Sequence, residues 1–262
     1  MLKLENISLG YGKQKVLTDI NLSASRGEML GIIGPNGSGK STMIRGICRL
    51  LTPRTGHVII NEQDVSQISR IELARLVAVV PQTPNLPDTF TAFEIVLMGR
   101  TPHLGRFRFE GRTDFEIAWQ AMEITNTQSF AERTMDQLSG GQKQLLTIAR
   151  ALAQEPKLIL LDEPTAHLDI NYQTETLDFI RGLCIKQDLA AIAVLHDLNL
   201  AAQYCDRLVL LNNGRIHTEG SPQEVITERN IKEVYRANVC VYPHPINELP
   251  TIVITHGESK AL

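Results

Sequence analysis

Short, continuously apolar runs alternate with longer amphipathic segments through most of the chain. The runs are too short for helices and have no polar face, which is typical of strands buried on both sides of a parallel sheet. They lie at residues 29–33, 76–80, 158–161, 189–195 and 208–211. Amphipathic segments with apolar residues at helical spacing lie between them, so the pattern predicts an α/β fold.

Two stretches depart from this pattern. Residues 2–9 and 15–24 alternate apolar and polar positions on either side of a turn, which predicts an antiparallel hairpin ahead of the first buried strand. Residues 88–155 are expected to be mostly helical, because a capping box begins at Thr91 and a second helix covers about 113–126. The chain therefore combines an α/β core with an N-terminal antiparallel β subdomain and a helical insert.

Length and composition suit one globular domain. The 262 residues are 43% hydrophobic and 21% charged, which is ordinary for a folded protein. We expect a single domain over residues 1–262, in which residues 1–87 and 156–262 form the α/β core with its β subdomain and residues 88–155 form the helical insert. The chain is expected to end in a short strand at 251–254 and a polar tail.

Charge and hydropathy exclude several classes of protein. The net charge of −3 argues against a nucleic-acid protein held by a general basic field. Arginines and phenylalanines do interleave at 100–112, but such a run is more often a solvated loop or a protein contact. No apolar run approaches the roughly 18 residues of a membrane span, and the first residues lack a signal-peptide pattern. The four scattered cysteines suggest a reducing, cytoplasmic environment.

Residues 34–41 read Gly-Pro-Asn-Gly-Ser-Gly-Lys-Ser and fill every fixed position of the phosphate-loop pattern G-x-x-x-x-G-K-[ST]. Glycines allow positive φ angles and a close approach of the backbone to a ligand. The loop lies between a buried strand and a helix, so its amides and the helix N-terminus converge on phosphate oxygens. Lys40 adds a positive charge near the β- and γ-phosphates, and the Ser41 hydroxyl suits Mg²⁺. These features predict nucleoside triphosphate binding.

Two carboxylates follow the buried strand at 158–161. Asp162 suits the coordination shell of Mg²⁺, either directly or through water. Glu163 comes one residue later and is placed to accept a proton from an attacking water. An ordinary acidic turn would have the same composition, but the phosphate loop already requires a metal-binding carboxylate of this kind.

Polar residues at other strand ends and turns remain open to two interpretations. Gln82 is either a ligand of Mg²⁺ or water, or a polar cap on a strand. His196 either contacts the γ-phosphate or water, or forms a helix-capping pair with Asp197. Tyr11 could stack on a nucleotide base, although its spacing alone favours an ordinary exposed turn residue.

A second glycine-rich helix start occurs at residues 138–142, which read Leu-Ser-Gly-Gly-Gln. Ser139 is placed to cap the helix, and the two glycines leave backbone amides accessible. The segment is therefore either a second anion site, without a lysine of its own, or a plain helix cap.

In this order, the motifs resemble the nucleotide-binding subunit of ATP-binding-cassette (ABC) transporters over nearly the whole chain. Residues 34–41 match the Walker A loop, 138–142 the family's signature sequence, and 158–163 Walker B with its catalytic glutamate. Single positions also match: Tyr11 the base-stacking aromatic, Gln82 the Q-loop, Leu168 and Asp169 the D-loop, and His196 the switch histidine. Residues 166–167 differ from the pair found in many members, which leaves the resemblance intact.

The resemblance implies a P-loop ATPase that uses ATP and Mg²⁺. Glu163, His196, Gln82 and Lys40 would be catalytic, and Ser41, Gln82 and Asp162 would hold Mg²⁺. ATP would be bound by Tyr11, Gly34, Pro35, Asn36, Gly37, Ser38, Gly39, Lys40, Ser41 and Thr42. The other subunit of a dimer would contribute Ser139, Gly140, Gly141, Gln142 and Asp169 in trans.

The resemblance also implies an assembly. Two identical subunits would meet head to tail and dock under membrane permease subunits, whose coupling helices lie beside the Q-loop and the helical insert. The subunit would then be peripheral to the cytoplasmic face of the membrane, with a substrate-binding protein as an indirect partner and no nucleic acid.

Three short segments of the sequence indicate a subfamily of ABC transporters. Residues 99–105, 165–169 and 196–201 resemble importers of ferric siderophores, haem and cobalamin, among which we favour iron–siderophore uptake. The alternative is a soluble ABC ATPase of a cytosolic machine such as iron–sulfur cluster assembly. A DNA-repair or chromosome-organising ATPase would need a long heptad run, which the sequence lacks.

Overall fold

The computed structural model describes residues 1–83, 86–105, 109–166 and 168–254. A six-stranded sheet forms its centre, with the strand order β10-β9-β3-β8-β7-β6. The strands are β3 (Met29–Ile33), β6 (Val77–Val80), β7 (Leu158–Asp162), β8 (Ala190–Val194), β9 (Arg207–Asn212) and β10 (Arg215–Gly220). Neighbouring strands pair in parallel except β9 and β10, which form an antiparallel hairpin.

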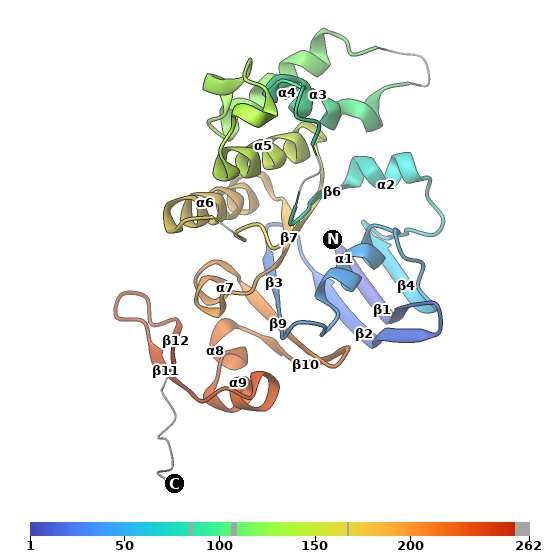
Figure 1. Cartoon of the computed structure of the whole chain (residues 1–262). Coiled ribbons are helices and arrows are strands. Elements are labelled where there is room, and N and C mark those ends of the chain that lie inside the picture. Colours follow the sequence, from blue (N-terminus) through green and yellow to red (C-terminus); the bar gives the residue numbers. More distant parts are fainter. Residues whose placement is uncertain (84–85, 106–108, 167, 255–262) are drawn as a thin grey trace.

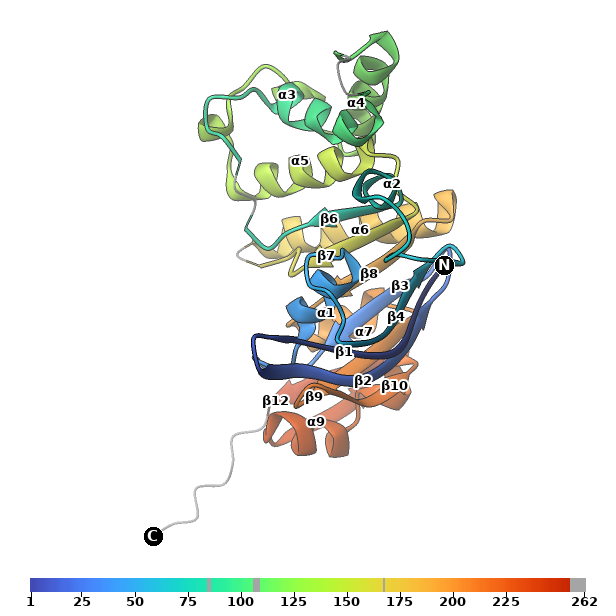
Figure 2. The same ribbon diagram turned by 90° about the vertical axis from the view of Figure 1, so that its right-hand side faces the viewer.

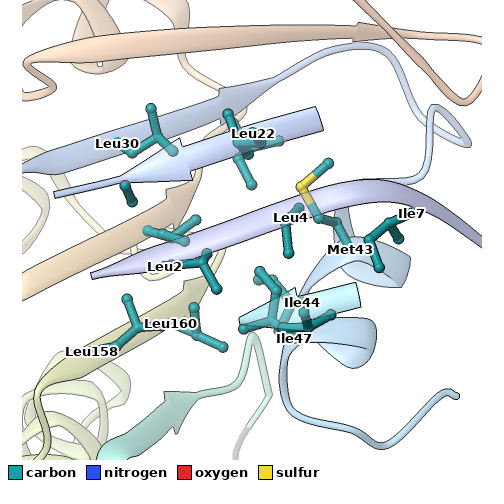
Figure 3. Close-up of a cluster of buried hydrophobic side chains, with 14 of the residues drawn as sticks. Leu2, Leu4, Ile7, Leu22, Leu30, Met43, Ile44, Ile47, Leu158 and Leu160 are labelled. Carbon is teal, nitrogen blue, oxygen red and sulfur yellow. The ribbon is translucent and has the colours of Figure 1, made fainter. Parts of the chain in front are cut away.

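Both faces of this sheet are covered, because the central strands are apolar on both sides. In β3, Leu30 and Ile32 face one core, whereas Met29 and Ile33 face the other. The first core lies between the sheet, the helix α1 (Lys40–Ile47) and the N-terminal sheet, and Figure 3 shows its side chains meeting. The second core is closed by α6 (Ile170–Gln187), α7 (Leu198–Tyr204) and the second half of α5 (Gly140–Ala153).

The N-terminal sheet is antiparallel, as predicted. Its strand order is β2-β1-β4-β5, and the strands are β1 (Leu2–Tyr11), β2 (Gln14–Ala24), β4 (Thr55–Ile60) and β5 (Gln63–Asp64). Leu2, Leu4 and Leu22 are buried against the central sheet, so the alternation seen in the sequence separates a core face from a polar face.

The helical insert forms a separate block at one end of the central sheet (Figures 1 and 2). It contains α3 (Ala92–Leu97), α4 (Arg112–Ile124), α5, and the short 3₁₀ turns Met98–His103, Gln128–Phe130 and Met135–Gln137. The expected capping box is present, because Thr91 and Glu94 bond each other's backbone amides at the start of α3. The helix α2 (Arg70–Leu76) precedes β6, which leads into the insert. The α/β fold with an antiparallel β subdomain and a helical region is confirmed.

Arg100 belongs to the core of the insert and not to a free basic surface. Its side chain is buried, and it donates to Asp114 at 3.0 Å, to Glu155 at 2.7 Å and to the Ala153 carbonyl at 2.7 Å. Residues 106–108 of the arginine–phenylalanine segment lie outside the described residues. Because Arg100 is buried and already pairs with two carboxylates, this residue of the segment is unsuited to phosphate contacts.

The C-terminal part differs from expectation in one strand. It contains α8 (Pro222–Val225), α9 (Glu228–Tyr235), β11 (Val239–Pro243) and β12 (Pro250–Ile254). The strand expected at 251–254 is present, but β11 was not expected. None of the residues of β11 is fully buried, so its sequence has no clear inward face, and pairing with β12 stabilises it. No helix within the described ranges is long and apolar enough to cross a membrane.

Candidate nucleotide site

The phosphate loop connects β3 to α1, with both neighbours as expected. Gly34 has a φ of 149°, and a Cβ atom there would lie 2.4 Å from the Leu211 carbonyl oxygen. Gly39 is the N-cap residue before α1 and has a φ of 109°, and a Cβ atom there would lie 2.4 Å from the Leu17 side chain. Both positions favour glycine because of their positive φ angles, and at Gly34 the backbone oxygen of Leu211 also leaves no space for a side chain. The loop is therefore held in one shape by its surroundings.

Lys40 lies inside this loop. Its ammonium is buried and donates to the carbonyl oxygens of Gly34 at 2.8 Å and Pro35 at 3.1 Å. Burial lowers the pKa of Lys40, whereas the nearby carboxylates of Glu163 and Asp162 oppose that shift. A phosphate in the loop would meet a positive charge already removed from water, where an electrostatic contact is strongest.

The Ser38 hydroxyl also supports an anion site here. Its oxygen is buried and has no hydrogen-bond partner within the described part of the chain. Buried polar atoms normally have partners, and this one lies in the middle of the glycine-rich loop. A phosphate oxygen is a suitable acceptor for it.

Ser41 and Asp162 bring two oxygen donors together. The Ser41 hydroxyl donates to Asp162 Oδ1 at 3.1 Å, and burial raises the pKa of Asp162. A hydroxyl and a carboxylate fit Mg²⁺, which usually takes few protein ligands and completes its shell with water and substrate phosphates. No group of three His, Cys, Asp or Glu side chains that could hold a metal ion occurs in the described ranges.

Glu163 lies between two other predicted catalytic side chains. Gln82 Nε2 donates to Glu163 Oε2 at 2.5 Å, and His196 Nε2 contacts Glu163 Oε1. The three residues follow β6, β7 and β8, which are adjacent parallel strands and therefore end at the same edge. Glu163 has a φ of 54°, which is unusual for a residue with a side chain and occurs often at functional sites. The carboxylate is thus fixed at both oxygens.

A contact with α1 orients Tyr11, and no pattern in the sequence predicts this contact. Arg45 donates to the Tyr11 hydroxyl at 3.1 Å, and hydrogen bonds from Thr42 and Arg45 lower the pKa of Tyr11. Its side chain is 43% exposed, so one side remains available to a ligand. The position of Arg45 four residues after Ser41 could have indicated its place near the site, because residues at this spacing lie on one face of a helix.

The signature segment caps α5 as predicted. Ser139 Oγ accepts from Gln142 N at 3.3 Å, and Gln142 Oε1 accepts from Ser139 N at 3.0 Å. Asp169 caps α6 in the same way, by accepting from Tyr172 N at 3.0 Å, while residue 167 lies outside the described residues. Among the described residues, no hydrogen bond joins Ser139, Gly140 or Gly141 to the phosphate loop. The signature segment lies in the helical insert, apart from α1 (Figure 1).

Comparison with known proteins identifies the family. The model of the ABC transporter family matches residues 17–166. A probable siderophore transport system ATP-binding protein of Bacillus subtilis is 38% identical, covering 100% of this chain and 94% of that protein. A cobalamin import ATP-binding protein of Halobacterium salinarum is 41% identical over 96% of this chain, which spans only 63% of that relative.

Two solved structures are similar along most of their length. One is described as a metal-chelate type ABC transporter in an inward-facing conformation, with a TM-score of 0.86, 28% identity and 98% of both chains covered. The other is an ATP-binding cassette solved as a dimer with ADP and phosphate, with a TM-score of 0.74, 31% identity, and 84% of this chain and 98% of that chain covered. The chain belongs to the ABC transporter family as an ATP-binding subunit, an enzyme that couples ATP hydrolysis to transport.

Proposed function

We propose that this protein is the ATPase of an importer, most specifically one for iron–siderophore complexes, and that it works as a head-to-tail homodimer. The observation that carries the proposal is the meeting of Lys40, Asp162 and Glu163 at one edge of the central sheet. The contact between Ser41 and Asp162 and the contacts from Gln82 and His196 to Glu163 support it.

The side chains divide the reaction between them. Lys40 and the loop amides bind the phosphates, while Ser41, Asp162 and Gln82 would hold Mg²⁺. The metal would supply positive charge to the leaving and transferred phosphate oxygens. Glu163 accepts a proton from the attacking water, and His196 and Gln82 hold its carboxylate in place. Tyr11 stacks on the base.

A single subunit supplies only one side of this site. The phosphate loop and the catalytic carboxylate come from the central sheet, whereas the other anion-suited helix start, at Ser139, lies in the insert. A head-to-tail dimer would bring Ser139, Gly140, Gly141, Gln142 and Asp169 to the ATP of the partner. The similar ATP-binding cassette solved as a dimer with ADP and phosphate supports a dimer for this protein.

The transport role follows from the relatives. The name of the Bacillus subtilis relative supports siderophore import, and that of the metal-chelate transporter supports a metal complex as cargo. The cobalamin import relative keeps cobalamin as an alternative cargo. Two permease subunits would hold the dimer at the cytoplasmic face of the membrane, with a binding protein delivering cargo. Cargo-stimulated ATPase activity in reconstituted vesicles, compared between a ferric siderophore, haem and cobalamin, would identify the substrate. Activity without any membrane partner in the cell would favour a soluble machine.

Mixing inactive variants tests the dimer. Lys40→Ala and Ser139→Arg subunits should each be inactive alone. In their mixed dimer both lesions fall on one site and leave the other intact, so ATP hydrolysis should return. Lys40→Ala mixed with Glu163→Gln is the matched control, because both lesions lie on the same half and every site stays damaged. If neither mixture hydrolyses ATP, while a dimer with one wild-type subunit does, the head-to-tail arrangement is wrong.

A further inference from the structure

The backbone of Gly141 lies directly against the ring of Tyr172. A Cβ atom built at Gly141 would lie 2.6 Å from Tyr172 Cγ and 2.8 Å from both Cδ1 and Cδ2. The same atom built at Gly140 would meet nothing within 4 Å. The two glycines of the signature segment therefore differ: Gly140 faces open space, whereas Gly141 is required for close contact with the ring.

Tyr172 is also tied to the segment before α6. Its backbone amide donates to the Asp169 carboxylate at 3.0 Å, which caps the helix. The neighbouring side chain of Gln173 donates to the carbonyl of Leu168 at 3.0 Å. The residue that touches the signature glycine is thus part of the helix turn that fixes Asp169.

The contact lies at the first turn of α5, where it can restrict the orientation of that turn. The second half of α5 is anchored, because Ile148 and Ala151 belong to the core beneath the central sheet. The rest of the insert packs around its own core, so the first turn of α5 has fewer contacts with the central sheet than the second half of the helix. A rigid aromatic ring at Gly141 restricts how that turn can tilt.

We propose that Tyr172 is a positioning residue that sets the start of α5 against Asp169, so that both reach the ATP of the partner subunit as one unit. This inference rests on the proposed head-to-tail dimer. The ring carries the effect, because the structure gives no hydrogen bond to the Tyr172 hydroxyl within the described residues.

The first test separates ATP binding from dimer formation. Tyr172→Ala should leave the ATP affinity of the monomer unchanged, because the phosphate loop of the same chain is untouched. In a Glu163→Gln background it should weaken ATP-driven dimerisation about three- to tenfold per site, the range for one aromatic contact. Tyr172→Phe should retain dimerisation. A general loss of structure would instead weaken ATP binding and lower the melting temperature of the monomer.

The second test asks which half-site the residue serves. A mixture of Tyr172→Ala with Lys40→Ala should hydrolyse ATP as well as wild type mixed with Lys40→Ala, because the lesions share one site. A mixture of Tyr172→Ala with Ser139→Arg should be weaker than wild type mixed with Ser139→Arg. Equal results in both mixtures would overturn the role of Tyr172, provided that Lys40→Ala and Ser139→Arg complement. If those two do not complement, the head-to-tail dimer itself fails.

A double-mutant cycle tests the contact itself. Gly141→Ala should impair dimerisation through overlap with the ring, and adding Tyr172→Ala should recover part of the loss. Gly140→Ala is the matched comparison, and its effect should be independent of Tyr172. If Gly141→Ala is equally harmful with and without the ring, the contact does not position the signature segment.

Discussion

The Ser41 hydroxyl donates to Asp162 across 3.1 Å, although the two residues lie 121 positions apart in the sequence. The pair joins the start of α1 to the end of β7 and brings a hydroxyl and a carboxylate together near the buried ammonium of Lys40. Glu163 follows immediately and is held by Gln82 and His196. This arrangement makes the expected effect of each side chain distinct.

Lys40→Ala should abolish hydrolysis by removing the buried charge of the phosphate loop. The loss of one preorganised electrostatic contact costs about 3–4 kcal/mol, so ATP binding should also weaken strongly. Lys232→Ala, at an exposed position on α9, is the control and should change neither quantity. Calorimetric ATP binding and phosphate release measure the two effects, and near wild-type turnover in Lys40→Ala would rule out the phosphate-loop assignment.

Glu163→Gln should separate binding from chemistry. The amide keeps the shape of the side chain but cannot accept the proton of water, so the variant should bind ATP normally and hydrolyse it very slowly. It should therefore accumulate as an ATP-bound dimer in gel filtration with ATP and Mg²⁺. Asp162→Asn is the contrasting variant, which should lose Mg²⁺-dependent ATP affinity. A monomeric Glu163→Gln protein with normal turnover would remove Glu163 from the catalytic role.

Tyr11→Ala should weaken ATP binding by about 1–3 kcal/mol, the usual contribution of one base stacked on an aromatic ring. Tyr11→Phe keeps the ring but loses the bond from Arg45, so its loss should be smaller. Inorganic tripolyphosphate has no base, and its affinity should be the same for all three proteins. An equal loss for tripolyphosphate and ATP would show that Tyr11 acts on the phosphate loop instead.

Asp114→Asn should lower the melting temperature at neutral pH. The loss in stability should be about 1.5 kcal/mol, the lower end of the range for a hydrogen bond to a charged group, because this bond is only partly buried. The amide of Gly111 and the guanidinium of Arg100 hold the pKa of Asp114 below its ordinary value of 3.8. The carboxylate therefore stabilises the fold above that pH, and its contribution disappears as the pH falls through the lowered pKa. The difference between wild type and variant should shrink below pH 3.8.

Glu116→Gln is the matched control for this measurement. Glu116 pairs with the exposed Arg112, and such surface pairs contribute about 0–1 kcal/mol. Its melting temperature should stay close to that of wild type. A difference for Asp114→Asn that persists unchanged at low pH would contradict the proposed charge effect.

The sequence by itself determined the elements whose cause is local. The phosphate loop, the capping box at Thr91, the helix cap at Ser139 and the buried strands are set by residues a few positions apart, and the structure has all of them. The motif order also identified the family, because each motif constrains a short, continuous stretch. These signals need no knowledge of which strands become neighbours.

The tertiary structure alone decided the contacts between distant residues. From the sequence, Gln82 could be either a ligand or a strand cap. The strand order β8-β7-β6 places it beside Glu163, to which it donates a hydrogen bond. The Tyr11 orientation depends on α1, and β11 depends on β12, because a weakly patterned strand forms only when its partner is adjacent. Gly141 on α5 and Tyr172 on α6 are 31 positions apart in the sequence, and their contact joins the two helices. Such contacts follow from the three-dimensional order of the elements, which no local pattern specifies.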